Sequence, residues 1–373
     1  MRIGFFVPRC APDNSHGRYV IELAKRLAPL HDVTVYAGTF SASLPAGLAC
    51  RSLPVPNRPA LLRLAALWAA STVAVRRQDF DILHVQGADS PVGDIVTAHC
   101  CNRAMRDAAA DTPTLFRKVN YAAGVAAERY CLRKPSTRAV VAVSRKVEEE
   151  IRRHYGVAAD KIAVIPPGVD IDWFHPRQGA RSREAVRERY RLASDDFVIA
   201  FVGGDYRLKG LGTLLRAAGL VDGRVRVMAL GVKADPALRR LVAGDGVGSS
   251  AVVLIHKVSD IAAYYAAADC FALPTRYDTF SLATLEAMAS GLPVIVSGAA
   301  GVTEHLRDGV DALVLDRPDD VTGLAGHLRR LAGDATLRGK LAVAGRETAR
   351  RFSWDRVADQ TLSVYRQVVG VGR

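Results

Sequence analysis

Short apolar segments alternate with helical stretches along the whole chain. The segments are rich in Val, Ile and Ala and are bounded by charged residues or turn signals, as buried strands are. When a helix separates successive strands, the strands pair in parallel and the helices cover the sheet. The pattern therefore predicts an α/β protein. The expected strands are 3–7, 33–36, 82–85, 95–98, 139–143 and 162–165 in the first half, and 197–202, 225–230, 252–255, 270–273 and 294–297 in the second.

The series of strands is interrupted once, near the middle of the chain. Pro166-Pro-Gly-Val-Asp170 breaks regular structure, and residues 176–181 are predicted to be a linker. A chain of 373 residues is long enough for two domains of ordinary size. We therefore predict Rossmann-like domains at residues 1–176 and 177–351, followed by a C-terminal helix within 352–373.

The composition is that of a globular protein, with 49% hydrophobic and 24% charged residues. No apolar run approaches the roughly 20 residues that span a bilayer. The N-terminus passes from Arg2 into a predicted strand without the pattern of a signal peptide. The six cysteines show no C-x-x-C spacing, so neither a zinc site nor a disulfide framework is indicated. We expect a reducing, cytosolic location.

The net charge of +13 raises the alternative of a nucleic-acid-binding module. No helix-turn-helix, zinc-finger, RNP or GxxG signature supports that alternative. The clearest local surplus lies in residues 103–138, where eight Lys or Arg stand against three Asp or Glu and aromatic residues are interleaved. This composition suits docking on an anionic membrane face. A solvated helical face is the alternative explanation.

One segment in the second half, from Thr275 to Pro293, combines helix signals with acidic residues. It lies between two predicted strands, and a glycine and a proline near its end stop the helix. Asp278, Thr279 and Ser281 are candidate N-caps. Open α/β sheets bind ligands at the carboxyl ends of their strands, and the N-terminus of a helix favours phosphate.

Two acids of this segment, Asp278 and Glu286, are eight positions apart. On a helical path at about 1.5 Å per residue, their separation is roughly 12 Å. Such a span could reach across a nucleotide diphosphate and place one carboxylate near each sugar. Glu286 leans toward the apolar side of its helix, and a buried carboxylate needs partners. A structural salt bridge with an arginine is therefore the alternative.

The segment resembles the E-x7-E region of the retaining glycosyltransferases of family 4. The spacing is kept, although the first acid is Asp278 where the family more usually has Glu. Residues 286–295 and 301–305 are also similar to the family's pattern. The resemblance implies the GT-B fold, in which two Rossmann-like domains face a central cleft and a C-terminal helix crosses back to the first domain.

The resemblance also implies roles for these residues. Asp278 would hold the hydroxyls of the transferred sugar, and Glu286 would hold those of the ribose. The N-terminus of the helix would neutralise charge on the departing diphosphate. The donor-binding residues expected in this segment are Thr279, Phe280, Ser281, Leu282 and Glu286.

A glycine-rich turn after the predicted strand 197–202 is the second candidate site. Glycines permit close backbone approach, and two cations beside a helix that begins near Leu211 favour an anion. The turn is not a Walker A loop. It resembles the family's diphosphate site, and the alternative is that its basic residues are simply solvated. The resemblance implies that Gly203 and Gly204 bind the donor. It also implies that Arg207 and Lys209, which neutralise the charge on the departing diphosphate, are catalytic residues together with Asp278 and His99.

Two positions in the first domain complete the expected site. Gly17 ends the first strand-to-helix loop, where family members often carry a paired glycine that faces the donor; His16 replaces the first glycine. His99 follows strand 95–98 and resembles a family position at the donor sugar or diphosphate. The alternative is a loop histidine without a role. No G-x-G-x-x-G follows the first strand, which argues against a dinucleotide oxidoreductase.

Two Asp-x-Asp patterns, Asp79–Asp81 and Asp170–Asp172, raise the alternative of a metal-binding transferase. Neither pattern has supporting ligands nearby in the sequence. We therefore predict no catalytic metal, and no cofactor apart from the nucleotide sugar that acts as donor substrate.

From the resemblance we expect a retaining, metal-independent hexosyltransferase with a nucleotide diphosphate sugar, a UDP-sugar above all, as donor. Same-face attack through an ion-pair-like state, favoured for the family, needs no carboxylate nucleophile. The chain is similar to lipopolysaccharide core glucosyltransferases at 203–210, at 165–168 and around His99. This implies a glycolipid, lipopolysaccharide or other cell-surface glycan acceptor, and a peripheral position on the inner face of the plasma membrane. A small natural product as acceptor, or a sugar-nucleotide epimerase of the same fold, are the alternatives.

Overall fold

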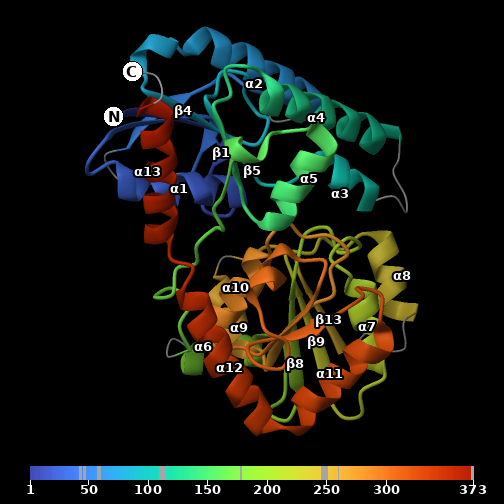
Figure 1. Cartoon of the computed structure of the whole chain (residues 1–373). Coiled ribbons are helices and arrows are strands. Elements are labelled where there is room, and N and C mark those ends of the chain that lie inside the picture. Colours follow the sequence, from blue (N-terminus) through green and yellow to red (C-terminus); the bar gives the residue numbers. More distant parts are fainter. Residues whose placement is uncertain are drawn as a thin grey trace. The chain divides into compact units, whose positions relative to one another are not determined.

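The computed structural model describes residues 1–41, 44, 48–56, 60–108, 115–176, 179–244, 251–258 and 260–370. The chain divides into two compact units, each built on one parallel sheet (Figure 1). The first unit contains Met1–Gly168 and Trp354–Arg373, and the second contains Val169–Ser353. The predicted α/β architecture with two Rossmann-like halves is confirmed.

The first sheet has the strand order β3-β2-β1-β4-β5-β6-β7, and its neighbouring strands run parallel. Its central strands are buried on both faces, as expected when helices cover a parallel sheet. The strands are β1 (Arg2–Cys10), β2 (Asp32–Phe40), β3 (Ala49–Ser52), β4 (Ile82–Gln86), β5 (Ile95–Ala98), β6 (Ala139–Ala142) and β7 (Ile162–Val164).

Helices on the first sheet begin at polar caps where the sequence offers them. Asn14 accepts a hydrogen bond from the Gly17 N–H at the start of α1, and Ser144 accepts one from the Val147 N–H at the start of α5. Gly156 ends α5 in the left-handed conformation. The helices of this unit are α1 (Ser15–Leu27), α2 (Ala60–Ala74), α3 (Asn102–Ala108), α4 (Leu115–Arg133), α5 (Arg145–Tyr155) and α13 (Trp354–Gly370).

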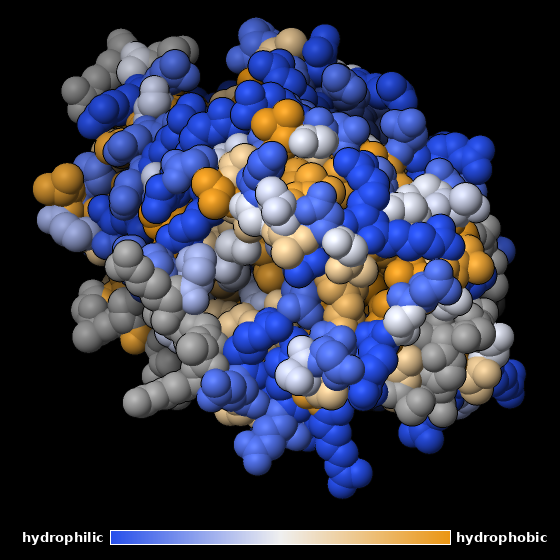
Figure 2. Space-filling view, turned by 90° about the horizontal axis from the view of Figure 1, so that it is seen from below, coloured by the Kyte–Doolittle hydropathy of each residue, from blue (hydrophilic) through white to orange (hydrophobic). Residues whose placement is uncertain are grey.

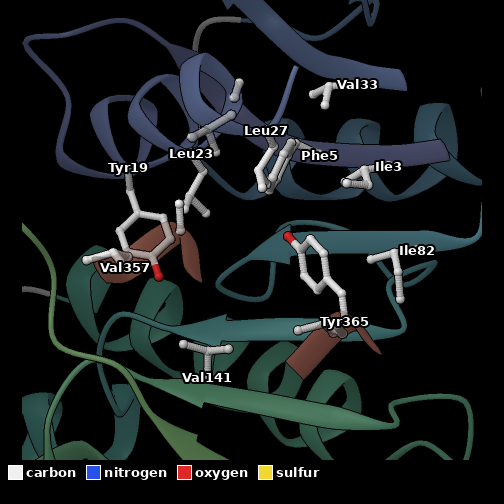
Figure 3. Close-up of a cluster of buried hydrophobic side chains, with 14 of the residues drawn as sticks. Ile3, Phe5, Tyr19, Leu23, Leu27, Val33, Ile82, Val141, Val357 and Tyr365 are labelled. Carbon is white, nitrogen blue, oxygen red and sulfur yellow. The ribbon is translucent and has the colours of Figure 1, made fainter. Parts of the chain in front are cut away.

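The C-terminal helix α13 is part of the core of the first unit. Its apolar side packs with β1, β2 and α1 in one buried cluster, and Figure 3 shows Tyr365 and Val357 among the side chains of these elements. The Tyr365 hydroxyl lies 2.6 Å from Nδ1 of the buried His84 on β4. The helix that was predicted from its apolar periodicity therefore completes the first unit, although it follows the second in the sequence.

The second sheet has the strand order β10-β9-β8-β11-β12-β13 and is also parallel. Its strands are β8 (Phe197–Val202), β9 (Val225–Leu230), β10 (Val252–Ile255), β11 (Cys270–Leu273), β12 (Val294–Ser297) and β13 (Leu313–Leu315). Its helices are α6 (Gly179–Arg189), α7 (Leu211–Gly219), α8 (Pro236–Gly244), α9 (Ile261–Ala267), α10 (Leu282–Ala289), α11 (Val321–Gly333) and α12 (Ala335–Arg350).

The boundary between the units falls at Gly168, not at the expected residue 176. The segment between these positions packs on the second unit, where the Val169 N–H donates to the Phe352 carbonyl over 2.8 Å. Arg346 also donates to the Phe174 carbonyl over 2.9 Å. Part of the predicted linker, residues 177 and 178, lies outside the described residues.

Among the described residues, no helix is long and apolar enough to cross a membrane. In the space-filling view of Figure 2, hydrophilic residues make up most of the visible face and apolar residues show between them. The predicted docking segment 103–138 is described except for residues 109–114, and the side chains of 115–117 are likewise outside the description.

Candidate active site

The strand order of the second sheet reverses between β8 and β11. The chain runs from β8 to β9 and β10 on one side, and from β11 to β12 and β13 on the other. In open α/β sheets such a switch point is where ligands bind, at the carboxyl ends of the strands. The loops that follow the two strands, residues 203–210 and 274–281, contain most of the predicted donor-binding residues.

The two loops are held together by backbone contacts. The Arg276 N–H donates to the Leu208 carbonyl over 2.8 Å, and the Thr275 hydroxyl lies 3.2 Å from the same oxygen. Gly210 has a φ of +79°, and a Cβ on this residue would lie 1.9 Å from the Pro274 carbonyl oxygen. Only glycine allows this close approach, so Gly210 fixes one loop against the other.

Lys209 and Asp278 meet across the switch point. Lys209 Nζ lies 2.5 Å from Asp278 Oδ2, and the side chains are 23% and 12% exposed. The aliphatic part of Lys209 lies over Gly203, because a Cβ on Gly203 would be 2.7 Å from Lys209 Cγ. The structure thus brings together two predicted site residues that are distant in the sequence, and the glycine turn makes room for the lysine.

The backbone around Asp278 is fixed by the loop that follows β12. The Gly301 N–H donates to the Asp278 carbonyl over 3.1 Å, and the Val302 N–H donates to the Phe280 carbonyl over 2.7 Å. Asp278 also forms an isolated parallel bridge with Ala300. Its expected place as a helix cap is therefore wrong: Asp278 lies in an extended segment before α10, with its carboxylate on Lys209.

The expectation of a side-chain cap by Ser281 is also wrong. Ser281 precedes Leu282, the first residue of α10, but its φ is +80° and its side chain does not cap the helix. Its hydroxyl lies 2.7 Å from the Thr284 hydroxyl. A left-handed conformation costs a non-glycine residue about 1–3 kcal/mol, and such strain is concentrated at functional sites. The first N–H groups of α10 have no acceptors within the helix, which is the general property that suits a helix N-terminus to anions.

Glu286 lies on α10 and is 5% exposed. The Tyr265 hydroxyl is 3.3 Å from Glu286 Oε2 and 3.2 Å from the Ala283 carbonyl. A carboxylate in this setting is held in place by its surroundings, which suits a group that receives hydrogen bonds from sugar hydroxyls.

Arg207 contacts its neighbour Tyr206 in the structure, and its predicted contact with a diphosphate stays a prediction. Its Nε donates to the Tyr206 hydroxyl over 3.2 Å, and its guanidinium lies 5.5 Å from the centre of the Tyr206 ring. The Tyr206 hydroxyl in turn lies 3.2 Å from Asp235 Oδ1. These partners were not predicted, because no spacing in the sequence connects Tyr206 with Asp235.

His99 belongs to the first unit, where it follows β5. Its Nε2 lies 2.8 Å from Gln86 Oε1, and its ring stacks on His16 at 4.1 Å. Burial, with His16 nearby, holds the pKa of His99 well below its usual value, and burial lowers the pKa of His16 to about 4. Both rings are therefore neutral at physiological pH. The predicted contact of His99 with the donor stays a prediction.

Gly17 is required by packing at the start of α1. A Cβ there would lie 2.6 Å from the Arg9 carbonyl oxygen and from the Ala11 backbone. Its N–H donates to Asn14 Oδ1 over 2.8 Å. These contacts explain the glycine without a ligand, and the predicted contact of Gly17 with the donor stays a prediction.

A cavity of about 240 Å³ lies in the first unit at the carboxyl ends of β4 and β5. It contains two carboxyl groups that the sequence analysis did not single out, Asp89 and Glu128. Burial raises the pKa of Asp89 to about 7, and burial also raises that of Glu128 to about 7, although Tyr155 and the Asn102 N–H donate to the latter. The lining residues used below are His16, Arg63, Asp89, Asn102, Asn120 and Glu128.

The two Asp-x-Asp patterns have structural roles. Asp170 Oδ1 accepts hydrogen bonds from the N–H groups of Asp172 and Trp173, which closes a turn, and Asp81 pairs with Arg2. Within the part of the chain that the structure describes, no three His, Cys, Asp or Glu side chains are grouped so that they could hold a metal ion.

Two family models match the chain, one on each unit. The model described as Glycosyltransferase Family 4 matches residues 16–173, and the model described as Glycosyl transferases group 1 matches residues 196–334. A D-inositol 3-phosphate glycosyltransferase of Xylanimonas cellulosilytica is 36% identical over 237 residues, which are 61% of this chain and 57% of that protein. The chain thus matches little more than half the length of such curated relatives.

Solved structures with the GT-B fold are similar over almost the whole chain. WaaG, a glycosyltransferase involved in lipopolysaccharide biosynthesis, has a TM-score of 0.83 with 21% identity and covers 97% of this chain and 99% of its own. HepE of Anabaena, in complex with UDP-glucose, has a TM-score of 0.75 with 19% identity and covers 98% and 100%. At these identities the likeness establishes the fold.

Proposed function

Because the chain belongs to glycosyltransferase family 4 and has the GT-B fold, we propose that it transfers a hexose from a nucleotide diphosphate sugar to an acceptor hydroxyl. The observation that carries this proposal is the contact between Lys209 and Asp278 at the switch point of the second sheet, where Lys209 Nζ lies 2.5 Å from Asp278 Oδ2. One side chain can neutralise a diphosphate and the other can bind sugar hydroxyls.

In this proposal the donor lies at the carboxyl ends of β8 and β11. Lys209 and the N-terminus of α10 stabilise the negative charge that develops on the departing diphosphate, an electrostatic role that needs no metal ion. Asp278 accepts hydrogen bonds from the transferred sugar, and Glu286 accepts them from the ribose. Arg207 also contacts the diphosphate. Its exposed side chain belongs to the same loop as Lys209 and leaves Tyr206 when the donor binds.

We assign retention of the anomeric configuration to same-face attack. A covalent route would need a carboxylate free to attack the anomeric carbon. In the structure the Asp278 carboxylate is engaged by Lys209, and in the proposal it receives hydroxyls of the transferred sugar once a diphosphate takes Lys209, so it is not left free to attack. A stereochemical analysis of the product by NMR tests retention, and an inverted product would contradict it. A covalent sugar–enzyme adduct detected by mass spectrometry would contradict the same-face route.

We propose UDP-glucose as the first donor to test, since HepE, which shares the fold, holds this nucleotide sugar. Thermal shift across UDP-, GDP- and ADP-sugars should give the largest stabilisation with the true donor, because a ligand that binds only the folded state raises its stability. Release of free nucleotide that depends on an acceptor then establishes transfer. Epimerised donor without acceptor-dependent release would favour the epimerase.

We further propose that the acceptor is a glycolipid or another cell-surface glycan and that the chain works at the cytoplasmic face of the plasma membrane. Exposed apolar residues on neighbouring helices support this: Val73 on α2 is 86% exposed, and Val119 and Tyr130 on α4 are also exposed. Lys118 and Arg129 on α4 are exposed cations. Apolar and basic side chains together favour an anionic bilayer surface.

Co-sedimentation with vesicles tests the membrane proposal. Binding should require anionic lipid and should weaken as salt is raised, because exposed charges are screened. A double variant with Lys118→Glu and Arg129→Glu should lose most of the bound fraction, while Lys340→Glu, an exposed lysine on α12, serves as the control. Absence of binding at low salt would remove the membrane and leave a small, water-soluble acceptor.

A further inference from the structure

The cavity in the first unit lies beside a switch point of its own. The strand order of the first sheet reverses between β1 and β4. The cavity opens at the carboxyl ends of β4 and β5, where α/β sheets bind ligands. His16, near the start of α1, and Glu128, on α4, are among the residues that line it. At about 240 Å³ it is small for a ligand site and suits one six-membered ring more than an oligosaccharide.

The charged groups of the cavity are mainly acidic. Among the described residues that line it, Asp89 and Glu128 stand against one cation, Arg63, and the two imidazoles are neutral. Glu128 is 5% exposed and already accepts hydrogen bonds from the Asn102 N–H at 2.7 Å and from the Tyr155 hydroxyl at 2.5 Å. Because both carboxyl groups have pKa values near 7, they are mostly ionised above pH 7, and a phosphate brought beside them there would be repelled.

Hydrogen-bonding groups remain in the cavity for a ligand. Asn120 Oδ1 is buried and has no hydrogen-bond partner among the described residues. Asp89 has Arg63 as its electrostatic partner, and the described part of the chain offers its carboxylate no hydrogen bond. Gly87, which also lines the cavity, has a φ of +68°, and a Cβ there would be 3.8 Å from Asp89 Oδ2. The absence of a side chain at this position keeps the space beside the carboxylate open.

We propose that this cavity binds an unphosphorylated polyol ring of the acceptor through Asp89, Asn120 and Glu128, and that it excludes rings that carry a phosphate. Carboxylate and amide oxygens accept hydrogen bonds from hydroxyl groups, whereas a phosphate offers acceptors only. The proposal rests on the proposed transferase function and names its acceptor class. It separates this chain from the relatives named for D-inositol 3-phosphate, in which the acceptor is a phosphorylated ring.

Isothermal titration of the full chain without donor at pH 8, where Asp89 and Glu128 are mostly ionised, tests the proposal directly. Two matched pairs of probes are used, myo-inositol with D-inositol 3-phosphate and glucose with glucose 6-phosphate. At least one unphosphorylated ring should bind, and about ten-fold or more tightly than its phosphate, because like charges brought together cost at least this much. Equal or tighter binding of the phosphorylated member, or no binding of either unphosphorylated ring, would overturn the proposal.

Three variants distinguish the effect of the Asp89 charge on binding from the effect of the cavity volume. Asp89→Asn keeps the shape of the side chain; it should weaken binding of the unphosphorylated ring and reduce the preference over the phosphate several-fold. Ala123→Leu, on the cavity wall, should weaken both members of a pair and leave their ratio unchanged. Asp160→Asn, an exposed acid of the same unit, should change neither. A preference unaltered in Asp89→Asn, with thermal unfolding like that of the parent, would contradict the role of this carboxylate.

Release of nucleotide from UDP-glucose, measured in parallel, distinguishes the two ideas. Binding with the expected preference but no turnover of any nucleotide sugar would remove the transferase function and leave the polyol site. Turnover of the donor without the preference would leave the transferase and remove the proposed acceptor class.

Discussion

Lys209 Nζ lies 2.5 Å from Asp278 Oδ2, although the two residues are 69 positions apart. They come from the loops after β8 and β11, the neighbouring strands at which the sheet reverses. The lysine is therefore the counter-ion of a partly buried carboxylate. A diphosphate that takes Lys209 must weaken this pair, which leaves Asp278 able to receive the hydroxyls of the sugar that arrives with it.

Lys209→Met should lower kcat by about 10²–10³-fold, the typical loss when one group that stabilises developing charge is removed. Methionine keeps an unbranched apolar stem over Gly203, so the loop should hold its shape. Lys209→Ala should lose as much turnover and in addition some stability, because it removes the packing on Gly203. Steady-state kinetics with the best donor and urea unfolding give the two quantities.

The matched control is Lys233→Met, on an exposed lysine in the loop after β9, which should keep nearly normal turnover. Near-normal turnover of Lys209→Met would contradict the assignment of Lys209 to the diphosphate.

Asp278→Asn should separate nucleotide binding from sugar transfer. Loss of the charged acceptor should lower turnover by about 10–100-fold, as expected for a hydrogen bond to a charged group worth about 1.5–3 kcal/mol. Affinity for UDP alone should stay the same or increase, because Lys209 no longer has a competing carboxylate. Titration with UDP checks this, and a large loss of UDP affinity would show that Asp278 serves the nucleotide and not the sugar.

Gly210→Ala should disrupt the contact between the two loops. The new Cβ would lie 1.9 Å from the Pro274 carbonyl oxygen, in a backbone conformation that alanine disfavours. Together these effects should cost about 3 kcal/mol. Gly309→Ala is the control: its φ of +71° is similar, but a Cβ there meets open space, so only about 1 kcal/mol is expected. Equal losses in urea unfolding would show that the contact with Pro274 contributes nothing.

The sequence predicted the elements better at the centre of each sheet than at its edges. Central strands such as β11 are buried on both faces, so they are continuous apolar runs that can be recognised. The edge strand β3 (Ala49–Ser52) was missed because all four residues are exposed and no alternation marks them. The short strand β13 (Leu313–Leu315) was missed as well.

The candidate site was predictable as two separate patterns but not as one arrangement. The spacing of Asp278 and Glu286 and the glycine turn before Lys209 are local features. Their contact depends on β8 lying beside β11, and strand order is a property of the tertiary fold. The cap expected at Ser281 is wrong for a similar reason: tertiary contacts with the loop after β12 fix the segment before Ser281, and no local pattern in the sequence indicates them.

The cavity of the first unit gave a weaker signal. Asp89 follows a predicted strand, as a ligand-binding residue of an α/β protein often does. Glu128, however, lies in the middle of α4, where a sequence pattern does not distinguish an acid that faces a cavity from one that faces solvent. Only the packing of α4 against the strand ends identifies it.

A buried histidine couples the fold of the first unit to pH. His84 on β4 lies 2.6 Å from the Tyr365 hydroxyl through Nδ1 and 2.6 Å from the Thr97 hydroxyl through Nε2. A neutral ring has one N–H and one lone pair, so it donates to one hydroxyl and accepts from the other. Burial lowers the pKa of His84 to about 3. The ring therefore stays neutral in the folded state where an unfolded histidine, with a pKa near 6.5, takes up a proton.

The free energy of unfolding should consequently fall as pH is lowered from about 6.5. Below this value the unfolded state binds more protons at His84 than the folded state does, so stability is complete above pH 6.5 and is lost toward the folded pKa. Asp89 and Glu128 act in the opposite sense: burial raises the pKa of each to about 7, and their contribution to stability grows as pH falls from 7.

His84→Gln should unfold at a lower urea concentration than the parent at pH 7.5, because the hydroxyls of Tyr365 and Thr97 lose a partner. Between pH 6.5 and 4.5 this variant should lose less further stability than the parent, because it has no histidine to protonate at this position. Replacement of the exposed His256 by Gln controls for the loss of a histidine. If urea midpoints of the parent and His84→Gln fall in parallel over this range, protonation of His84 does not contribute to acid unfolding.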